Sequence, residues 1–569
     1  MLTNTMWVPR ASDCSAWRNI SSVTRNELLC AADAHLLDGG YPALTATQYM
    51  AYVRDGSRTA FEAPYFQRRK RLLSLMLAEC LTAQGKYLDE VIDGIWCICE
   101  ETTWFVSAHN LSGQPLAEAD DPCVDLFAAQ TASLLSWCAY LLEGILPDQI
   151  IRRVRREVTL RVLDPFFARD DFWWMGVIRK DLNNWTPWIL SNVLASAHIW
   201  SDSRDTDGRA MVMLDRWLAC IPPDGGLDEG VSYWNMAGGS LLDCLEHLGA
   251  DRFGESKIRN LAAFPLRTHI GNQYFLNFAD CDACPVLDGE RVYTFGLRAE
   301  NSGLMTLGAA LAATEPSVLP ADTPETYRVL CKLFHPLPAP GSIPHEDATL
   351  PDSQLWVRRH GGLFAAIKGG HNAESHNHND VGTFIVYLDG EPAIVDAGNM
   401  VYTAKTFQDA TRYTLWNTRS TNHNLPLIGE WEQAPGEAYA AQNVAFGPES
   451  ASMDISGAYP SAAGVKRLHR KLSLVDRGLT LTDEISLSHA APVTWVYLLR
   501  HAPTLKGCQA RTGNILLQWN DGLAAACTEY PVTDPRMAKN YPGSLYRLTL
   551  TAPCQALHTH TFHIARSMP

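Results

Sequence analysis

Residues 371–399, "HNAESHNHNDVGTFIVYLDGEPAIVDAGN", decide how the second half of the chain is interpreted. A β-rich run from Phe384 to Leu388 is followed by Asp389-Gly390 and then by a second β-rich run. An Asp-Gly pair between two such runs predicts a two-residue hairpin turn. Just ahead of the hairpin, eight residues contain three histidines: His371, His376 and His378. Folding alone does not require three histidines so close together. The stretch therefore predicts a β-hairpin with a functional site beside it.

Beyond this hairpin, apolar and polar residues alternate in several stretches up to the end of the chain. It is clear in "KLSLVDRGLTLTDEISL", "NILLQWNDGLAAACTEY" and "LYRLTLTAPCQALHTHTFHIA". Arg477-Gly478 and Asp521-Gly522 stand where further hairpin turns are expected. Residues 351–569 are therefore predicted to form an antiparallel β-sandwich domain.

The first part of the chain has helical periodicity instead. Apolar residues recur at three- and four-residue spacing in "RLLSLMLAECLTAQ", "DLFAAQTASLLSWCAYLLEGI", "QIIRRVRREVTLRVL", "WILSNVLASAHIW" and "GGSLLDCLEHLG". Short connections between these segments are typical of antiparallel helical hairpins. We predict a helical domain over residues 1–335 and a proline-rich linker over residues 336–350. A ligand site between an all-α and an all-β domain is the default expectation.

The net charge and the cysteine content argue against some classes of protein. The chain has 569 residues and a formal net charge of −15, which argues against a general nucleic-acid-binding protein. Its fifteen cysteines do not have the regular spacing of a disulfide framework, so reduced thiols are expected. No secretory signal and no membrane span of about 20 apolar residues are visible. A cytoplasmic location is expected, or a secreted or periplasmic one if a signal has been removed, and no membrane partner is expected. The oligomeric state is left open.

Several polar residues around the hairpin could form a site. If strand alternation runs through "SHNHND", His376, His378 and Asp380 face one side. His378, Asp396 and His423 make a plausible ligand set for a borderline metal such as zinc. The alternative is that these histidines are hydrogen-bonded structural residues.

Two stretches of the helical part also carry polar residues in unusual numbers. "DLNNWTPWIL" places Asn183 and Asn184 before an apolar helix, where only one of them can be the N-cap. "PDGGLDEGVSYW" gathers glycines around Asp228 and Glu229, ahead of Tyr233. A tight loop explains the glycines, and a half-buried structural tyrosine is the alternative for Tyr233.

Taken together, "NNWTPWI", "DGGLDEGVSYW" and "SHNHNDVGTFIVYLDGEPAIVDAG" resemble the heparinase II/III-like polysaccharide lyases in order and separation. The resemblance covers roughly residues 70 to 500. It implies an incomplete (α/α) toroid followed by an antiparallel β-sandwich, an α+β multidomain fold. The implied activity is β-elimination on a uronic-acid-containing polysaccharide such as heparan sulfate, hyaluronan or chondroitin. Alginate or an oligo-uronate is the alternative substrate.

The resemblance also implies roles for individual residues. Asn184 would neutralise the substrate carboxylate, Tyr233 would be the general acid, and His376 would abstract the proton or hold the carboxylate. Tyr413 lies near the position of a second catalytic tyrosine in alginate-directed relatives. The residues implied in substrate binding are Asn183, Trp185, Glu229 and Arg412. His378, Asp396 and His423 match the ligands of a structural zinc ion.

One departure from the family pattern stands out. Several relatives have a histidine directly after the second asparagine, whereas this chain has Trp185 there. If that histidine is the base for one uronate epimer, His376 or Tyr413 must replace it.

Three further interpretations stay open. The basic runs "QRRKR" (residues 67–71) and "RRVRR" (residues 152–156) are expected to be solvated helix faces, with a subset reaching an acidic polymer as the alternative. A glycoside hydrolase on a helical toroid would need two carboxylates flanking the bond, and no second acidic pair stands out. A non-catalytic carbohydrate-binding protein would have no use for Tyr233 and His376 together.

Overall fold

The computed structural model describes residues 7–110, 112–320 and 325–567. The chain divides into two compact units. The helical unit comprises Met1–Cys220, Asn235–Gly254 and Asp288–Ser342, and the β unit comprises Ile221–Trp234, Glu255–Leu287 and Ile343–Pro569. The segment that carries Tyr233 therefore packs with the β-strands, although helices precede and follow it in sequence. Within the described ranges, no helix combines the length and the apolarity of a membrane span.

The helical unit confirms the helices predicted from periodicity. Its α-helices are α1 (Cys14–Arg18), α2 (Ser22–Leu37), α3 (Ala46–Asp55), α4 (Thr59–Thr82), α5 (Leu88–Cys99), α6 (Leu126–Leu141), α7 (Asp148–Val158), α8 (Asp164–Ala168), α9 (Trp185–Ile199), α10 (Thr206–Cys220), α11 (Ser240–Leu248), α13 (Gly289–Arg298), α14 (Ser302–Thr314) and α15 (Thr326–Phe334). Every residue of α6 is buried, and α6 packs against α9. The Asp125 carboxylate begins α6 by accepting hydrogen bonds from the amides of Phe127 and Ala128.

The two basic runs behave differently. The expectation of a solvated face is wrong for "QRRKR", because Arg68, Arg69 and Arg71 are buried in α4. Glu101 binds Arg68 at 3.0 Å and Arg69 at 2.7 Å, and Arg71 pairs with Glu90 at 2.6 Å. Helix α4 lies inside the unit, so its arginines must be neutralised by internal carboxylates. The expectation holds for α7, where Arg152, Arg155 and Arg156 are exposed.

The β unit is built on one connected sheet in which every strand pair is antiparallel among the described residues. Its main path runs β15-β16-β17-β19-β14-β8-β7-β5-β4-β3. The strands on this path are β3 (Ala348–Leu350), β4 (Leu355–His360), β5 (Leu363–Lys368), β7 (Phe384–Leu388), β8 (Glu391–Ile394), β14 (Gly478–Leu499), β15 (Thr504–Leu505), β16 (Gln509–Thr512), β17 (Ile515–Trp519) and β19 (Ser544–Arg566).

Further strands and helices complete the β unit. Strands β9 (Pro426–Ile428), β11 (Gln442–Phe446), β12 (Ser450–Asp454), β13 (Val465–Val475) and β18 (Ala524–Pro531) join the sheet off its main path, and β6 (His371–Asn372) pairs with β10 (Gly436–Ala440). A small hairpin joins β1 (His269–Gly271) to β2 (Tyr274–Phe275). The α-helices of the unit are α12 (Ser256–Thr268), α16 (Asp409–Arg412) and α17 (Pro535–Asn540).

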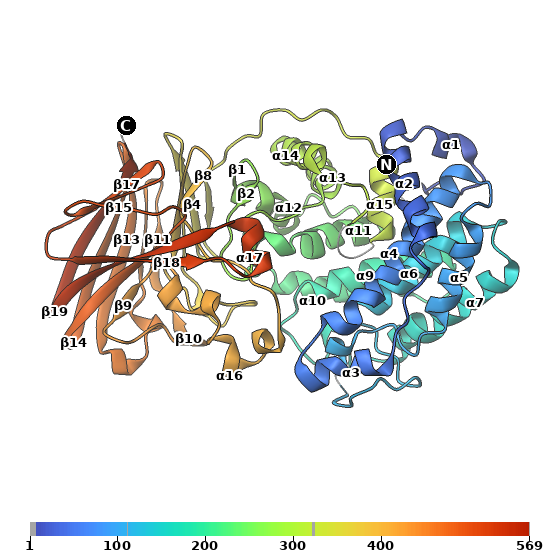
Figure 1. Ribbon diagram of the computed structural model, residues 1–569, viewed down its shortest axis with the longest axis horizontal. Helices are drawn as coiled ribbons and strands as arrows, with labels where there is room; N and C mark the ends of the chain where they lie inside the picture. The colour runs from blue at the N-terminus through green and yellow to red at the C-terminus, as the bar shows by residue number, and fades with distance from the viewer. Residues whose placement is uncertain (1–6, 111, 321–324, 568–569) are drawn as a thin grey trace. The chain divides into compact units, whose positions relative to one another are not determined.

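Strands β14 and β19 hold the sheet together. They have 22 and 23 residues and run side by side in Figure 1. Leu481 faces Phe562 and Tyr497 faces Leu548 across this ladder, and all four side chains are buried. Their register shifts between Ser486 and Val493, so the ladder is interrupted near its middle.

The three predicted hairpin turns have different outcomes. Asp389 and Gly390, with φ of 55° and 79°, form the predicted two-residue turn between β7 and β8. The turn between β13 and β14 is one residue earlier than predicted, because Gly478 already pairs with Val475. Asp521-Gly522 does not close a hairpin, since β17 and β18 pair with different stretches of β19.

The segment 221–234 is anchored to the β-strands by one carboxylate. Asp224 accepts hydrogen bonds from the backbone amides of Asp352 at 2.7 Å and Ser353 at 2.8 Å, and from the Ser353 hydroxyl at 2.7 Å. Gly225 has a φ of +74°, and a Cβ there would lie 2.3 Å from the backbone of Asn260. Gly225 is therefore required by close backbone approach, as expected for a glycine in a tight loop.

Candidate catalytic and metal site

The histidine-rich stretch is a loop rather than a strand. Residues 373–383 lie between β6 and β7 without strand pairing, and His376 has a φ of +56°. The predicted alternation is therefore wrong: His376, His378 and Asp380 do not share a strand face. The buried Lys368 ammonium lies under the loop, 2.9 Å from Asp380 and 3.1 Å from Glu374. A left-handed backbone at a histidine is strained, and such strain is concentrated at functional sites.

His376 contacts two tyrosines. Its Nδ1 lies 3.4 Å from the Tyr233 hydroxyl and 3.2 Å from the Tyr402 hydroxyl, and the two hydroxyls hydrogen-bond to each other. The rings of Tyr233 and His376 are 4.6 Å apart between centroids. The structure thus brings together two of the predicted catalytic residues and adds Tyr402, which the sequence analysis missed.

The buried carboxylate of Asp280 contacts both His376 and His378. Asp280 Oδ2 lies 3.0 Å from His376 Nδ1, and Asp280 Oδ1 lies 3.0 Å from His378 Nε2. Arg412 donates to Asp280 Oδ2 at 2.9 Å. Sequence reasoning also missed Asp280, which stands in the loop "FADCDACP" with no distinguishing spacing.

Burial, hydrogen bonds and neighbouring charges together shift the pKa values in this group. Burial would raise the pKa of Asp280, but hydrogen bonds from His376 and His378 and the charge of Arg412 hold it far below its usual range. Burial disfavours the His376 cation, yet the Asp280 hydrogen bond and the Glu229 carboxylate raise its pKa above the ordinary value. Burial, with Tyr402 and acidic neighbours, raises the pKa of Tyr233 well above its usual value, so this phenol keeps its proton at neutral pH.

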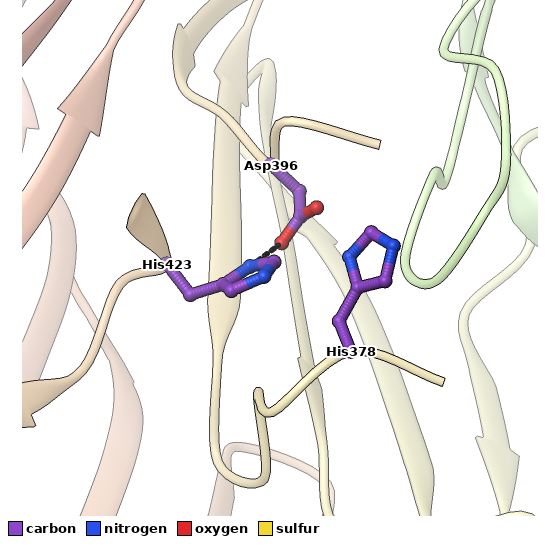
Figure 2. A group of neighbouring side chains, drawn as sticks. All are labelled: His378, Asp396 and His423. Carbon is purple, nitrogen blue, oxygen red and sulfur yellow. Dashed lines mark hydrogen bonds and ion pairs between the residues drawn. The ribbon is translucent and has the colours of Figure 1, made fainter. Parts of the chain in front are cut away.

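The predicted metal ligands form one buried cluster. One potential ligand atom from each of His378, Asp396 and His423 lies within 4.8 Å of the others, and all three side chains are fully buried. Figure 2 shows them converging from three separate segments of the β unit, with the Asp396 carboxylate 2.8 Å from His423 Nδ1. One ring nitrogen of His378 faces this pair and the other points away from it.

The donor set fits a divalent metal. His378 Nδ1 is buried and has no hydrogen-bond partner among the described residues. His423 Nε2 lies 2.9 Å from the backbone carbonyl of Asn417, which would hold the proton there and leave Nδ1 for a metal. Two imidazoles and one carboxylate are a common zinc set with a fourth position open. The cluster can therefore hold a metal ion, which agrees with the ligand set that the resemblance implied.

The remaining predicted residues of the β unit line the same loops. Glu229 is buried, and its Oε1 is 3.5 Å from His376 Nε2. The guanidinium of Arg412 donates to Asp280 and to the carbonyls of Asn377 and Thr406. These hydrogen bonds link the segments that carry the three acceptors. The Tyr413 hydroxyl lies 3.4 Å from the Asn377 amide nitrogen. Roles in substrate binding for Glu229 and Arg412, and in catalysis for Tyr413, stay predictions.

Three predicted residues belong to the helical unit. Asn183 accepts a hydrogen bond from the Trp185 amide at 3.1 Å. The buried Asn184 is the N-cap residue of α9, and its side chain makes no capping hydrogen bond to the described helix. Trp185 packs against His109 and Trp173, with ring centroids 4.6 Å and 5.0 Å away. Their predicted roles in catalysis and substrate binding stay predictions.

Residues 343–533 match the family model for the heparinase II/III-like C-terminal domain. This part of the chain is therefore similar to the C-terminal domain of the heparinase II/III-like proteins. It contains His376 and all three residues of the metal cluster, whereas Tyr233 and Asp280 precede it in sequence. The resemblance inferred from the three motifs is confirmed for this domain.

Solved structures extend the likeness to almost the whole chain. A crystal structure of heparinase III aligns with a TM-score of 0.67 at 12% identity, covering 100% of this chain and 87% of that one. A heparan sulfate lyase from Pedobacter heparinus aligns at 0.58 with 14% identity, covering 98% and 86%. A chondroitin AC lyase from Streptomyces coelicolor A3, solved with chondroitin sulphate, aligns at 0.55 with 11% identity, covering 96% and 83%. No curated protein matches the sequence significantly.

At these identities the likeness establishes the fold. A helical N-terminal region precedes the heparinase II/III-like antiparallel β domain, which confirms the predicted class of (α/α) toroid followed by β-sandwich. The fifteen cysteines are free thiols, as predicted.

Proposed function

We propose that this protein is a polysaccharide lyase that cleaves uronic-acid-containing chains by β-elimination. The observation that carries the proposal is the contact between the Tyr233 phenol and the His376 imidazole, at 3.4 Å, beside a heparinase II/III-like domain. Glycosaminoglycans such as heparan sulfate, hyaluronan and chondroitin are the proposed substrates, and alginate or an oligo-uronate is the alternative.

The reaction requires a base and an acid on one sugar ring. The base removes the proton at C5, the C4–O4 bond breaks, a C4–C5 double bond forms, and the acid protonates the departing O4. Tyr233 suits the acid because its raised pKa keeps the phenol protonated. His376 suits the base through Nε2, since its Nδ1 is already 3.0 Å from the Asp280 carboxylate. Once the proton has moved, the Glu229 carboxylate near Nε2 stabilises the imidazolium.

The C5 proton becomes acidic only if the adjacent carboxylate is neutralised. We assign this task to Asn184, whose amide can donate hydrogen bonds without adding charge. Asn183, Trp185, Glu229 and Arg412 are proposed to support substrate binding, and Tyr413 to be a second catalytic tyrosine if the substrate is alginate-like.

Zinc is the metal we propose for the cluster of His378, Asp396 and His423. When bound, the ion would link three loop segments and so fix the loop that carries His376. No proton transfer in the proposed reaction depends on it. The buried, partnerless Nδ1 of His378 supports this assignment.

The geometry favours elimination over hydrolysis. A glycosidase needs two carboxyl groups that flank the bond and are free to exchange protons. Asp280 is engaged by two histidines and an arginine, and Asp228 accepts from the backbone amides of Glu229 and Ser375. Neither is available as the partner of Glu229. A non-catalytic binding protein would not require a strained histidine against a protonated tyrosine.

A panel of uronate polysaccharides tests the proposal. Each polymer is incubated with the protein, and both ultraviolet absorbance and new reducing ends are followed. Elimination raises both because the product carries a conjugated unsaturated uronate, whereas hydrolysis raises only the reducing ends. Absence of both signals on every polymer would contradict a lyase.

A further inference from the structure

Asp280 is the one side chain, among those described, that hydrogen-bonds both the proposed catalytic histidine and a residue of the metal cluster. The carboxylate is about 1% exposed. Its Oδ1 meets His378 Nε2 at 3.0 Å, and its Oδ2 meets His376 Nδ1 at 3.0 Å and Arg412 Nη2 at 2.9 Å. The contacts join the loop 279–282 to the loop 376–378, about 100 positions later in the chain.

An ionised carboxylate only accepts hydrogen bonds, so each histidine must present an N–H to it. His376 therefore carries a proton on Nδ1, and its Nε2 is left for exchange with substrate. His378 carries its proton on Nε2, and its Nδ1 lone pair is left free. The free nitrogens are thus different atoms in the two rings, and one carboxylate selects both.

The surroundings of each free nitrogen agree with this division. His378 Nδ1 is buried and has no hydrogen-bond partner in the described part of the chain. Figure 2 shows one His378 ring nitrogen turned toward Asp396 and His423 and the other turned away from them. His376 Nε2 lies on the far side of its ring from Asp280, 3.5 Å from Glu229. Arg412 only donates, so it requires an oxygen at the Oδ2 position and fixes which oxygen serves which histidine.

We propose that Asp280 is a shared positioning residue: it sets the tautomer of His378 for metal binding and the tautomer of His376 for proton abstraction. The second half of this statement rests on the proposed lyase function, and the first half does not. Carboxylate partners of metal-binding histidines orient the ring and raise its basicity, and their loss typically lowers metal affinity by about 10- to 100-fold.

Asp280→Asn tests the proposal because the amide is not symmetrical. Arg412 retains the amide oxygen at the Oδ2 position, so the amide NH₂ faces His378 Nε2. His378 must then accept at Nε2 and carry its proton on Nδ1, which blocks the metal. His376 still meets an oxygen and keeps its Nδ1 proton. The variant should therefore lose metal affinity while the His376 tautomer is retained.

The probe is Zn²⁺ alone, titrated into metal-free protein against a chelator. We expect Asp280→Asn to bind Zn²⁺ about 10- to 100-fold more weakly than the wild type. Asp282→Asn is the matched control, since Asp282 lies in the same loop and binds Arg536 at 3.0 Å and Asn540 at 3.2 Å but touches neither histidine. The control should bind Zn²⁺ as the wild type does.

Ring-nitrogen NMR of histidine-labelled, metal-free protein gives the second readout. His376→Gln and His378→Gln assign the two rings by loss of signal. The wild type should show an Nε2–H tautomer for His378 and an Nδ1–H tautomer for His376, and this measurement stands even if Asp280→Asn does not fold. Wild-type Zn²⁺ affinity in Asp280→Asn, or the opposite tautomers in the wild type, would overturn the proposal. Neither readout needs a substrate, so an inactive protein would refute the lyase function and leave this test intact.

Discussion

The Tyr233 hydroxyl lies 3.4 Å from Nδ1 of His376, although 143 positions separate the two residues in sequence. The contact exists because the segment 221–234 leaves the helices on either side of it and packs with the β-strands. Asp224 anchors the segment at one end, and Tyr233 reaches the histidine loop at the other. The acid and the base of the proposed reaction are therefore held within one compact unit.

Tyr233→Phe should remove the proposed proton donor with little effect on folding. Loss of a general acid typically lowers the rate about 10²- to 10⁴-fold, whereas the hydroxyl contributes about 1 kcal/mol to stability. Turnover of the best polymer from the panel and thermal melting check the two effects separately.

Tyr439→Phe is the control for this variant, because Tyr439 is a half-buried tyrosine of β10 outside the site. It should keep wild-type turnover. If Tyr233→Phe retained most of the activity, Tyr233 would have to be removed from the mechanism.

His378→Ala should lower metal content and thermal stability together. The variant loses the imidazole whose Nδ1 faces Asp396 and His423, and a bound metal stabilises only the folded state. Elemental analysis and melting temperature are the measurements. His371→Ala, in β6 just before the loop and outside the metal cluster, should change neither. Unchanged metal content in His378→Ala would show that the cluster is a hydrogen-bonded structural group.

Asp224→Ala should loosen the Tyr233 segment and leave the metal cluster intact. Removal of this carboxylate leaves the amides of Asp352 and Ser353 without their acceptor, at about 1–3 kcal/mol each. We expect faster hydrogen exchange over residues 221–234 and lower turnover, with normal metal content. Asp352→Asn, which alters an exposed acid beside the anchor, is the control. Unchanged exchange in Asp224→Ala would contradict the anchoring role.

His247 should make the helical unit sensitive to acid. Burial, followed by the nearby His198 and Arg291, lowers the pKa of His247 to about 3. The folded state therefore resists protonation that the unfolded chain accepts below pH ~6.5, so stability is complete above that pH and falls as the pH drops toward 3. At pH 5 the free energy of unfolding is lower by roughly 2 kcal/mol. This pH lies about 1.5 pH units below the pKa of histidine in the unfolded chain, and each pH unit contributes about 1.36 kcal/mol.

Melting temperatures at pH 7.5 and pH 5 test this titration. His247→Gln removes the imidazole, so its melting temperature should fall less between the two pH values than that of the wild type. An equal fall in both proteins would assign the acid sensitivity to other groups.

Much of the fold followed from periodicity. Helices such as α6 and α9 have apolar residues at helical spacing. The β-rich runs on either side of Asp389-Gly390 pair as the predicted hairpin. One error, in the basic run of α4, came from tertiary burial. Arg68, Arg69 and Arg71 look like a solvated face, yet carboxylates distant in sequence allow them to lie inside the unit.

The site could be predicted only where its residues occur in recognisable local patterns. His376, His378, Asp396 and His423 stand within or near the hairpin motif, and Tyr233 lies in a glycine-rich loop. Asp280 and Tyr402 have no such context, because their importance arises from where the chain returns in space. An isolated aspartate in "FADCDACP" carries no local signal of the two histidines it binds.

The most direct test of the central claim is the ultraviolet absorbance of the products that the wild-type protein releases from uronate polysaccharides. The account predicts that absorbance and reducing ends rise in step on at least one polymer, and that Tyr233→Phe abolishes both. New reducing ends without absorbance would mean hydrolysis, and would contradict proton abstraction beside the uronate carboxylate.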